Sequence, residues 1–168
     1  IGSRPGNFAI QNADLVIVIG SRLNIRQISY NFKSFAKKAI VFHVDIDSNE
    51  LNKPLYKANY KIHADANFFI NEFKKLLTKQ KYNKVSNDWI DYCQRVKKDF
   101  DVMKENFLEN KKTINPYYAI NEIFNNAKST DVFISANASA CIIPFQVANL
   151  KRQQRLFSNS GSASMGYD

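Results

Sequence analysis

Two runs of β-branched residues constrain the fold more than any other feature of this chain. The first run occupies residues 14–20 and ends at Gly20, and the second occupies residues 39–47 and ends in carboxylates. Continuous apolar runs of this length are typical of strands that are buried on both faces of a parallel sheet. A weaker third strand is predicted over residues 60–65.

Helical patterns lie between and after these strands. Residues 31–38 are long enough for a short helix, and residues 67–80 carry apolar side chains at spacings of three and four, which predicts an amphipathic helix. Strands that alternate with helices indicate right-handed crossovers. The predicted fold class is therefore α/β, with a Rossmann-like parallel sheet.

The second half of the chain repeats this alternation. A long helix is predicted over residues 87–107, with Ser86 as its N-cap. The pair Asn115-Pro116 then opens a helix that runs to about residue 126, because proline suits the first helical position. The remaining predicted elements are a strand at 131–135, a short helix at 144–149 and a short strand at 156–158.

The organisation predicted from these patterns has three parts. Residues 1–80 are expected to be the C-terminal half of one α/β domain, and residues 81–113 a lysine-rich helical connector. Residues 114–168 are expected to begin a second α/β domain. Because each domain lacks elements that such folds normally contain, we expect the chain to be cut at both ends.

Charge and hydropathy exclude several classes of protein. The net charge is +9, but the lysines are dispersed or paired, as on solvated helix faces, so we expect no nucleic-acid partner. The longest apolar run, Leu15–Ile19, is far shorter than the ~20 residues that span a bilayer, and the first residues do not have the pattern of a signal peptide. The spacing of Cys93 and Cys141 suits neither a metal site nor a disulfide framework. We therefore expect a cytoplasmic protein without a membrane partner.

Four segments carry a resemblance to a known family. They are residues 7–14 (NFAIQNAD), 19–24 (IGSRLN), 43–47 (HVDID) followed by Glu50-Leu51, and 161–167 (GSASMGY). In this order and spacing they resemble thiamine-diphosphate-dependent enzymes of the acetolactate synthase type. The resemblance implies the second half of a central domain, followed by the start of a diphosphate-binding domain.

The resemblance also implies an activity for the parent protein. The family decarboxylates a 2-keto acid and then releases an aldehyde or joins the product to a second carbonyl compound. The resemblance further implies that the parent protein is a homodimer or homotetramer. Two other hypotheses stay open on the residues alone. One is a non-catalytic nucleotide-binding domain of the NAD or FAD type, and the other is a basic interaction module.

The resemblance assigns two segments of the second half to thiamine diphosphate. Met165 matches the bulky side chain that bends the cofactor, and Ala163 matches a residue that holds its aminopyrimidine ring. Asn137, Ala138 and Ser139 match the turn that contacts the diphosphate, although the family has an acidic residue and a glycine in this turn. The alternatives are that Met165 is a core residue and that Asn137 and Ser139 cap the next helix.

The resemblance assigns a second pocket to the first half. Arg22, Asp45 and Asp47 match residues that line the FAD pocket of some family members, whereas other members bind ADP or nothing there. Asn24 and Ile25 replace two acidic residues of the family pattern, which weakens the assignment of FAD. The alternative is that the aspartates cap helices and that Arg22 forms a structural ion pair.

The remaining catalytic parts are expected outside this chain. The family's Mg²⁺ ligands would follow Asp168, and its catalytic glutamate belongs to an N-terminal domain, so no metal ligand or catalytic residue is assigned here. The 168-residue chain alone is therefore expected to be inactive. His43 and His63 are expected to be hydrogen-bonded residues of the sheet, and Cys141 a small buried thiol.

Overall fold

The computed structural model describes residues 2–54, 58–79, 87–104, 112–159 and 164–166. The chain forms two compact units. One is Arg4–Lys97, and the other is Lys98–Asp168 together with Ile1–Ser3. Both units combine helices with parallel strands, which confirms the predicted α/β fold class. Among the described residues, no helix has the length and hydrophobicity needed to cross a membrane.

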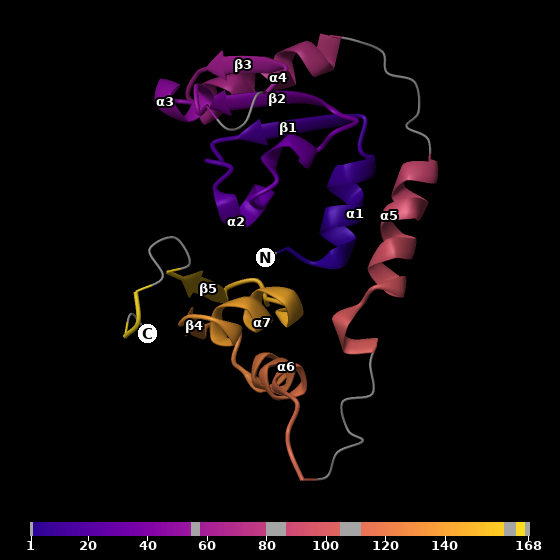
Figure 1. The fold of residues 1–168 in the computed structure, drawn as a ribbon, viewed down its shortest axis with the longest axis vertical. Coiled ribbons are helices and arrows are strands. Elements are labelled where there is room, and N and C mark those ends of the chain that lie inside the picture. Colours follow the sequence, from indigo (N-terminus) through magenta and orange to yellow (C-terminus); the bar gives the residue numbers. More distant parts are fainter. Residues whose placement is uncertain (1, 55–57, 80–86, 105–111, 160–163, 167–168) are drawn as a thin grey trace. The chain divides into compact units, whose positions relative to one another are not determined.

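The first unit is built on a parallel sheet of three strands. Its order is β1-β2-β3, so β2 pairs with a strand on each side (Figure 1). The elements of this unit, together with the helix that follows α4, are α1 (Arg4–Asn12), β1 (Leu15–Ile19), α2 (Ile25–Ile28), the 3₁₀ turn η1 (Phe32–Ser34), β2 (Ile40–Asp45), α3 (Ser48–Leu51), β3 (Tyr60–His63), α4 (Ala66–Lys79) and α5 (Asn87–Asp99).

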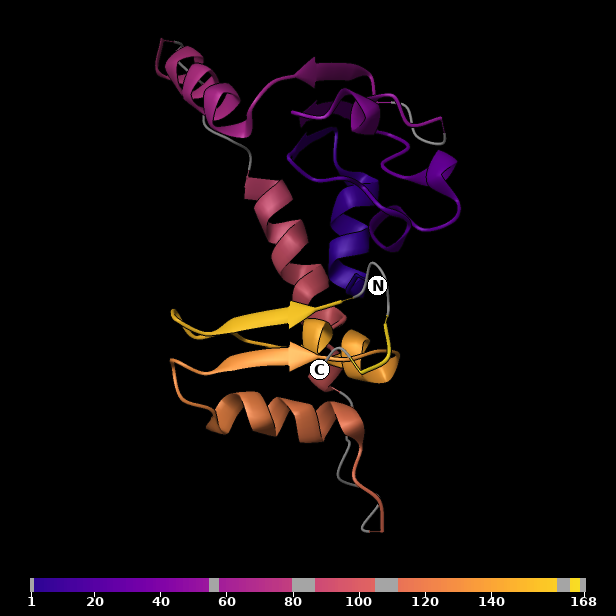
Figure 2. The same cartoon turned by 90° about the vertical axis from the view of Figure 1, so that its left-hand side faces the viewer.

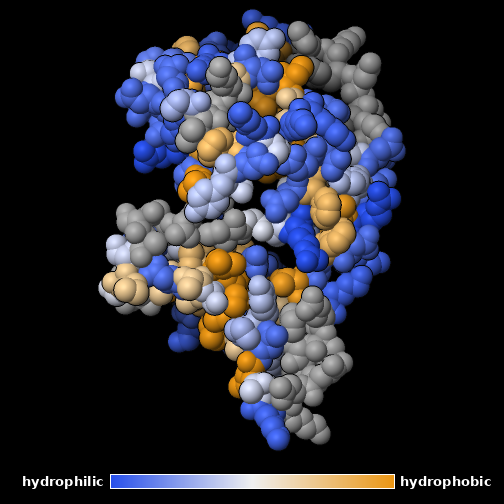
Figure 3. All heavy atoms as spheres, in the orientation of Figure 1, coloured by the Kyte–Doolittle hydropathy of each residue, from blue (hydrophilic) through white to orange (hydrophobic). Residues whose placement is uncertain are grey.

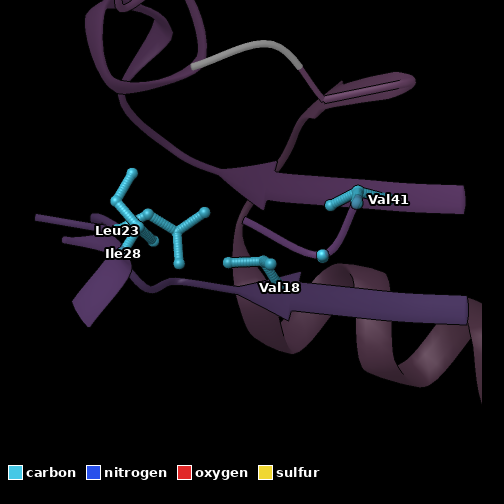
Figure 4. Packing of buried hydrophobic residues seen from close by; sticks show 5 residues of the cluster. Val18, Leu23, Ile28 and Val41 are labelled. Atoms are coloured by element: carbon cyan, nitrogen blue, oxygen red, sulfur yellow. The ribbon is translucent and has the colours of Figure 1, made fainter. Parts of the chain in front are cut away.

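A hydrophobic cluster holds β1 and β2 against the chain that follows β1. Val18 of β1 and Val41 of β2 pack with Leu23, Ile28 and Ala36. Figure 4 shows the side chains of Leu23 and Ile28 lying beside Val18. This cluster fixes the segment between β1 and β2, and that segment carries Arg22.

β1 differs from the prediction that it is buried on both faces. Leu15, Ile17 and Ile19 are exposed, whereas Val18 is buried. Because successive side chains of a strand point to opposite faces, only one face of β1 is covered by the described residues. Other apolar side chains also reach the molecular surface (Figure 3).

The second unit pairs two parallel strands and packs helices against them. Its elements are η2 (Val102–Lys104), α6 (Pro116–Asn126), β4 (Val132–Ser135), α7 (Ser139–Val147) and β5 (Arg155–Ser158). Figure 2 shows β4 and β5 pointing in the same direction, with α6 running beside them. Phe124 of α6 is buried with Ile143 and Val147 of α7. The Phe124 ring also lies against Phe133 of β4, with 4.3 Å between ring centroids.

Three helix predictions differ from the structure. Residues 31–38 form only the 3₁₀ turn η1, and the helix predicted over residues 87–107 ends at Asp99. α7 begins at Ser139, earlier than predicted, and it contains Pro144 in its interior. Proline is unfavourable in the interior of a helix because it has no backbone N–H group to donate a hydrogen bond. Burial of the neighbouring apolar side chains of α7 compensates for this loss.

The start of α6 agrees with its sequence pattern. Asn115 is the N-cap residue, and its side-chain oxygen accepts a hydrogen bond of 2.9 Å from the backbone N–H of Tyr117. Pro116 occupies the first helical position. The cap satisfies a backbone donor that the helix itself leaves unpaired, so the prediction for Asn115-Pro116 is confirmed.

The turn between β4 and α7 is strained at Ala138. This residue has φ +51° and ψ −127°, a conformation that only glycine adopts readily. Its carbonyl accepts hydrogen bonds from the N–H groups of Cys141 and Ile142, each 3.1 Å long. The first turn of α7 therefore holds Ala138 in an unfavourable conformation.

We expect Ala138→Gly to raise the free energy of unfolding of the second unit by about 1 kcal/mol, because relief of backbone strain outweighs the added entropy of the unfolded chain. Urea denaturation followed by far-ultraviolet circular dichroism measures the change. The control is Ala119→Gly in α6, which lacks a positive φ and is expected to destabilise by about 1 kcal/mol. Equal destabilisation by both substitutions would contradict strain at Ala138.

Candidate cofactor sites

The predicted diphosphate turn lies at the carboxyl end of β4. Asn137, Ala138 and Ser139 connect this strand to α7, whose first residue is Ser139. Ligands of parallel α/β sheets bind at such strand ends. The position of these residues therefore suits the role that the resemblance assigns to them.

Asn137 connects the two segments assigned to thiamine diphosphate. Its side-chain Nδ2 donates a hydrogen bond of 2.9 Å to the backbone carbonyl of Ser164, 27 positions further along the chain. Ser164 is the neighbour of Met165. The structure thus brings the diphosphate turn next to the segment predicted to hold the pyrimidine ring. Asn137 does not act as the N-cap of α7, since that position is Ala138.

The start of α7 has the electrostatic character of an anion site. Its N-cap residue, Ala138, has no side-chain atom that could accept a hydrogen bond from the first turn. The first N–H groups of a helix have no partner within the helix, and the helix dipole places partial positive charge there. Ser139 is exposed at this end and carries a hydroxyl group. Phosphate oxygens suit such a position.

Met165 has 91% of its surface exposed. The described residues therefore do not bury this side chain in a core. A flexible, polarizable side chain in this position is available to lie against a flat ring. Ala163, which was assigned to the same ring, lies outside the described residues.

Cys141 is buried in α7, as the sequence predicts. Its Sγ lies 3.0 Å from the hydroxyl oxygen of Ser158 at the end of β5. The thiol thus packs between α7 and β5, and this packing is a sufficient structural role for Cys141.

The three residues predicted to line a nucleotide pocket in the first unit do lie together. Arg22, Asp45 and Asp47 line a pocket of about 250 Å³ at the carboxyl ends of the strands. Parallel pairing explains this, because β1 and β2 end at the same edge of the sheet. Gly20, with φ +58°, turns the chain out of β1 there and donates from its N–H to the Val44 carbonyl at 2.9 Å.

Both aspartates make local hydrogen bonds. Asp47 is the N-cap of α3, and its Oδ1 accepts from the N–H of Asn49 at 2.9 Å. Asp45 is buried, and its Oδ1 accepts from the N–H of Asp47 at 2.9 Å. The helix-cap alternative is therefore confirmed for Asp47.

Glu50 is a residue of this pocket to which the sequence analysis assigns no role. It is buried in α3, and its Oε1 accepts hydrogen bonds from Nε of Arg22 at 2.9 Å and from Nη2 of Arg22 at 2.7 Å. Its Oε2 forms an ion pair with Lys53, and the Lys53 ammonium also donates to the Arg22 carbonyl at 2.6 Å. The only indication of this ion pair in the sequence is the spacing of three residues between Glu50 and Lys53.

These contacts shift the ionisation of the pair. Hydrogen bonds from Lys53 and from Arg22 lower the pKa of the Glu50 carboxyl below its ordinary value of 4.5, and desolvation opposes them. The hydrogen bond to Glu50 and its negative charge raise the pKa of Arg22. Both side chains are thus held in their charged forms.

Both histidines are hydrogen-bonded residues of the sheet, as predicted. His43 is buried, and its Nε2 lies 3.0 Å from the carbonyl oxygen of Ser21. His63 has Nε2 at 2.8 Å from the carbonyl oxygen of Ile46. Because a carbonyl only accepts, each Nε2 carries the proton. These rings therefore support the loops that follow β1 and β2.

A metal ion does not fit the described part of the chain. No group of three or more His, Cys, Asp or Glu side chains within it is arranged to hold one. The residues that the structure describes therefore contribute no metal centre to either candidate site.

The Glu50 contacts predict a pH dependence of stability. A lowered pKa in the folded state stabilises the fold above pH 4.5, and this contribution is lost as the pH falls through the folded-state pKa. Glu50→Gln removes it. We expect this variant to be less stable than the wild type at neutral pH and to approach wild-type stability as the pH falls below the folded-state pKa of Glu50.

Urea denaturation at each pH, followed by the fluorescence of Trp89, measures this difference. Trp89 is the single tryptophan of the chain and lies in α5. The control is Glu72→Gln, because Glu72 pairs with Lys75 at the surface of α4 and such pairs contribute little. A deficit in Glu50→Gln that stays constant with pH would refute the assignment.

Comparison with known proteins finds similarity over nearly the whole chain. Residues 1–73 match the family model described as the thiamine pyrophosphate enzyme central domain. Over 166 residues, or 99% of this chain, the identity is 28% to the acetolactate synthase large subunit of Buchnera aphidicola subsp. Acyrthosiphon pisum and 27% to that of Lactococcus lactis subsp. lactis. Acetolactate synthase isozyme 2 large subunit of Escherichia coli is 31% identical over 96 residues, which are 57% of the chain.

The chain spans only part of these relatives. It covers 28% of the Buchnera and Lactococcus proteins, and the Escherichia coli match covers 16% of that protein. The similarity nevertheless runs through both units, from the central-domain sheet to the turn after β4 and the segment at Met165. Residues 1–73 are therefore similar to the central domain of thiamine pyrophosphate enzymes, and nearly the whole chain is similar to acetolactate synthase large subunits.

Proposed function

We propose that this chain is part of a thiamine-diphosphate-dependent enzyme that acts on a 2-keto acid, as a decarboxylase or a carboligase. The observation that carries the proposal is the hydrogen bond from Asn137 to Ser164, which joins the two segments assigned to the cofactor. Similarity through both units does not favour the alternative of an independent nucleotide-binding domain of the NAD or FAD type.

The residues of the second unit suit the two ends of thiamine diphosphate. The start of α7, with Asn137, Ala138 and Ser139, would hold the diphosphate. Met165 and Ala163 would hold the aminopyrimidine ring, with the exposed Met165 side chain beneath the bend of the cofactor. Bound thiamine diphosphate supplies the electron sink for decarboxylation, and these residues bind and orient it.

The parent protein would complete the site with parts that this chain does not supply. We infer that Mg²⁺ is held by residues following the diphosphate-binding segment, and that the catalytic glutamate comes from another domain across a dimer interface. Residues 1–80 would belong to the central domain, 81–113 to a connector and 114–168 to the diphosphate-binding domain. The parent would be a cytoplasmic homodimer or homotetramer with a 2-keto acid substrate and no nucleic-acid or membrane partner.

The first test concerns the chain by itself. We expect the 168-residue chain to release no carbon dioxide from pyruvate or 2-ketobutyrate when thiamine diphosphate and Mg²⁺ are present, because it lacks the glutamate and the metal ligands proposed above. The complete product of the gene is expected to be active under the same conditions. Turnover by the chain alone would refute the proposal that other parts of the parent supply the glutamate and the metal ligands. An inactive complete product would refute the proposed function.

The second test concerns Asn137 in the complete product. We expect Asn137→Ala to raise the thiamine diphosphate concentration needed for half-maximal activity by about tenfold or more, since a hydrogen bond that orders the site is lost. The KM for the 2-keto acid at saturating cofactor should stay unchanged. The matched control is Asn126→Ala, because Asn126 donates to the Glu122 carbonyl within α6. An equal cofactor requirement in both variants would contradict the role of Asn137.

A further inference from the structure

The pocket at the carboxyl ends of β1 and β2 lies where parallel α/β sheets bind nucleotides, but its charge does not suit one. The residues that line it include one guanidinium, Arg22, and four carboxylates: Asp45, Asp47, Glu50 and Asp65. A dinucleotide or a nucleoside diphosphate would bring further negative charge to this position. Like charges at close range oppose binding in proportion to their number.

The guanidinium of Arg22 is already engaged. Its Nε and Nη2 atoms both contact Oε1 of Glu50. A diphosphate is normally held by this same face of an arginine, where two parallel N–H groups match two oxygen atoms. Because Glu50 is buried and charged, releasing Arg22 to a phosphate would leave one of its carboxylate oxygens without its partner.

The two helices that start at the pocket are capped by their own aspartates. Asp47 accepts from the N–H of Asn49 at the start of α3. Asp65 precedes α4, and its Oδ1 accepts from the N–H groups of Asn67 at 2.9 Å and Phe68 at 3.1 Å. These are the backbone donors that phosphate groups use at helix N-termini. Carboxylates occupy them here.

Lys53 adds a second polar connection between Glu50 and the loop that carries Arg22. Its ammonium pairs with Oε2 of Glu50 and donates to the carbonyl of Arg22. Arg22, Glu50 and Lys53 thus tie the loop after β1 to α3 through both side-chain and backbone atoms. We call these three residues the corner clamp.

We infer that the corner clamp is structural and that this pocket excludes the diphosphate of FAD or ADP. The residues do not fit the flavin that some relatives of the family carry, and no step of the reaction passes through it. Arg22 is a positioning residue for the loop after β1. This inference does not rest on the proposed thiamine diphosphate site, because its observations all come from the first unit.

The test uses the complete product of the gene and two readouts. The absorbance spectrum of the purified protein reports bound flavin, and the melting temperature with and without added FAD or ADP reports binding. We expect no flavin spectrum and no rise in melting temperature with either nucleotide. A flavin spectrum, or a rise in melting temperature that Arg22→Met abolishes, would overturn the inference.

A double-mutant cycle tests the clamp itself. We expect Arg22→Met and Glu50→Gln each to lower the melting temperature, and the double variant to lower it by less than the sum. Arg22→Lys keeps the charge but not the paired donors, so it should lie between wild type and Arg22→Met. The control is Lys61→Met, whose ammonium contacts Asn52 and not Glu50. Additive effects of Arg22→Met and Glu50→Gln would overturn the clamp, whatever the outcome of the cofactor assays.

Discussion

Parallel pairing of β2 with both of its neighbours is the constraint on which the first unit depends. It aligns the ends of β1, β2 and β3, so residues that follow separate strands in the sequence meet at one edge. Arg22 and Asp45 lie in one pocket for this reason, although they are far apart in the chain. The buried contacts of Val18 and Val41 hold the register that makes this possible. Packing of the strands therefore places these polar groups at one edge of the sheet, and their local hydrogen bonds determine whether they are available to a ligand.

The second unit uses the same principle with fewer strands. β4 and β5 are parallel, so the turn after β4 and the chain after β5 leave the same edge of the sheet. Asn137 follows the first of these strands and Ser164 follows the second, and their hydrogen bond spans the edge. A polar side chain at a strand end can thus join segments that sequence similarity alone treats as separate motifs. The strain at Ala138 lies in the same turn, at the residue preceding the helix that would face a diphosphate.

The sequence predicts the strands of both units well because apolar runs and their boundaries are local properties. Asn115-Pro116 is predicted for the same reason, since the cap and the proline act within one turn. The start of α7 is not predicted, because Pro144 argues against a helix and only burial of Ile143 and Val147 overrides it. The single buried face of β1 is also missed, since the pattern of a strand does not say which elements cover it. The structural role of Glu50 is not predicted, because it depends on contact with Arg22, which lies 28 positions earlier in the chain.

Helix caps distinguish the strand ends of the two sheets. At the first sheet, Asp47 and Asp65 place carboxylates on the initial N–H groups of α3 and α4, and Glu50 engages the arginine. At the second sheet, the residue before α7 is Ala138, whose side chain brings neither charge nor a hydrogen-bond acceptor. The helix dipole favours an anion at both ends, but at the first sheet the chain provides that anion itself. Parallel pairing places helix N-termini at the end of each sheet, and under the proposed function a few side chains next to the helices determine which of these ends accepts the cofactor.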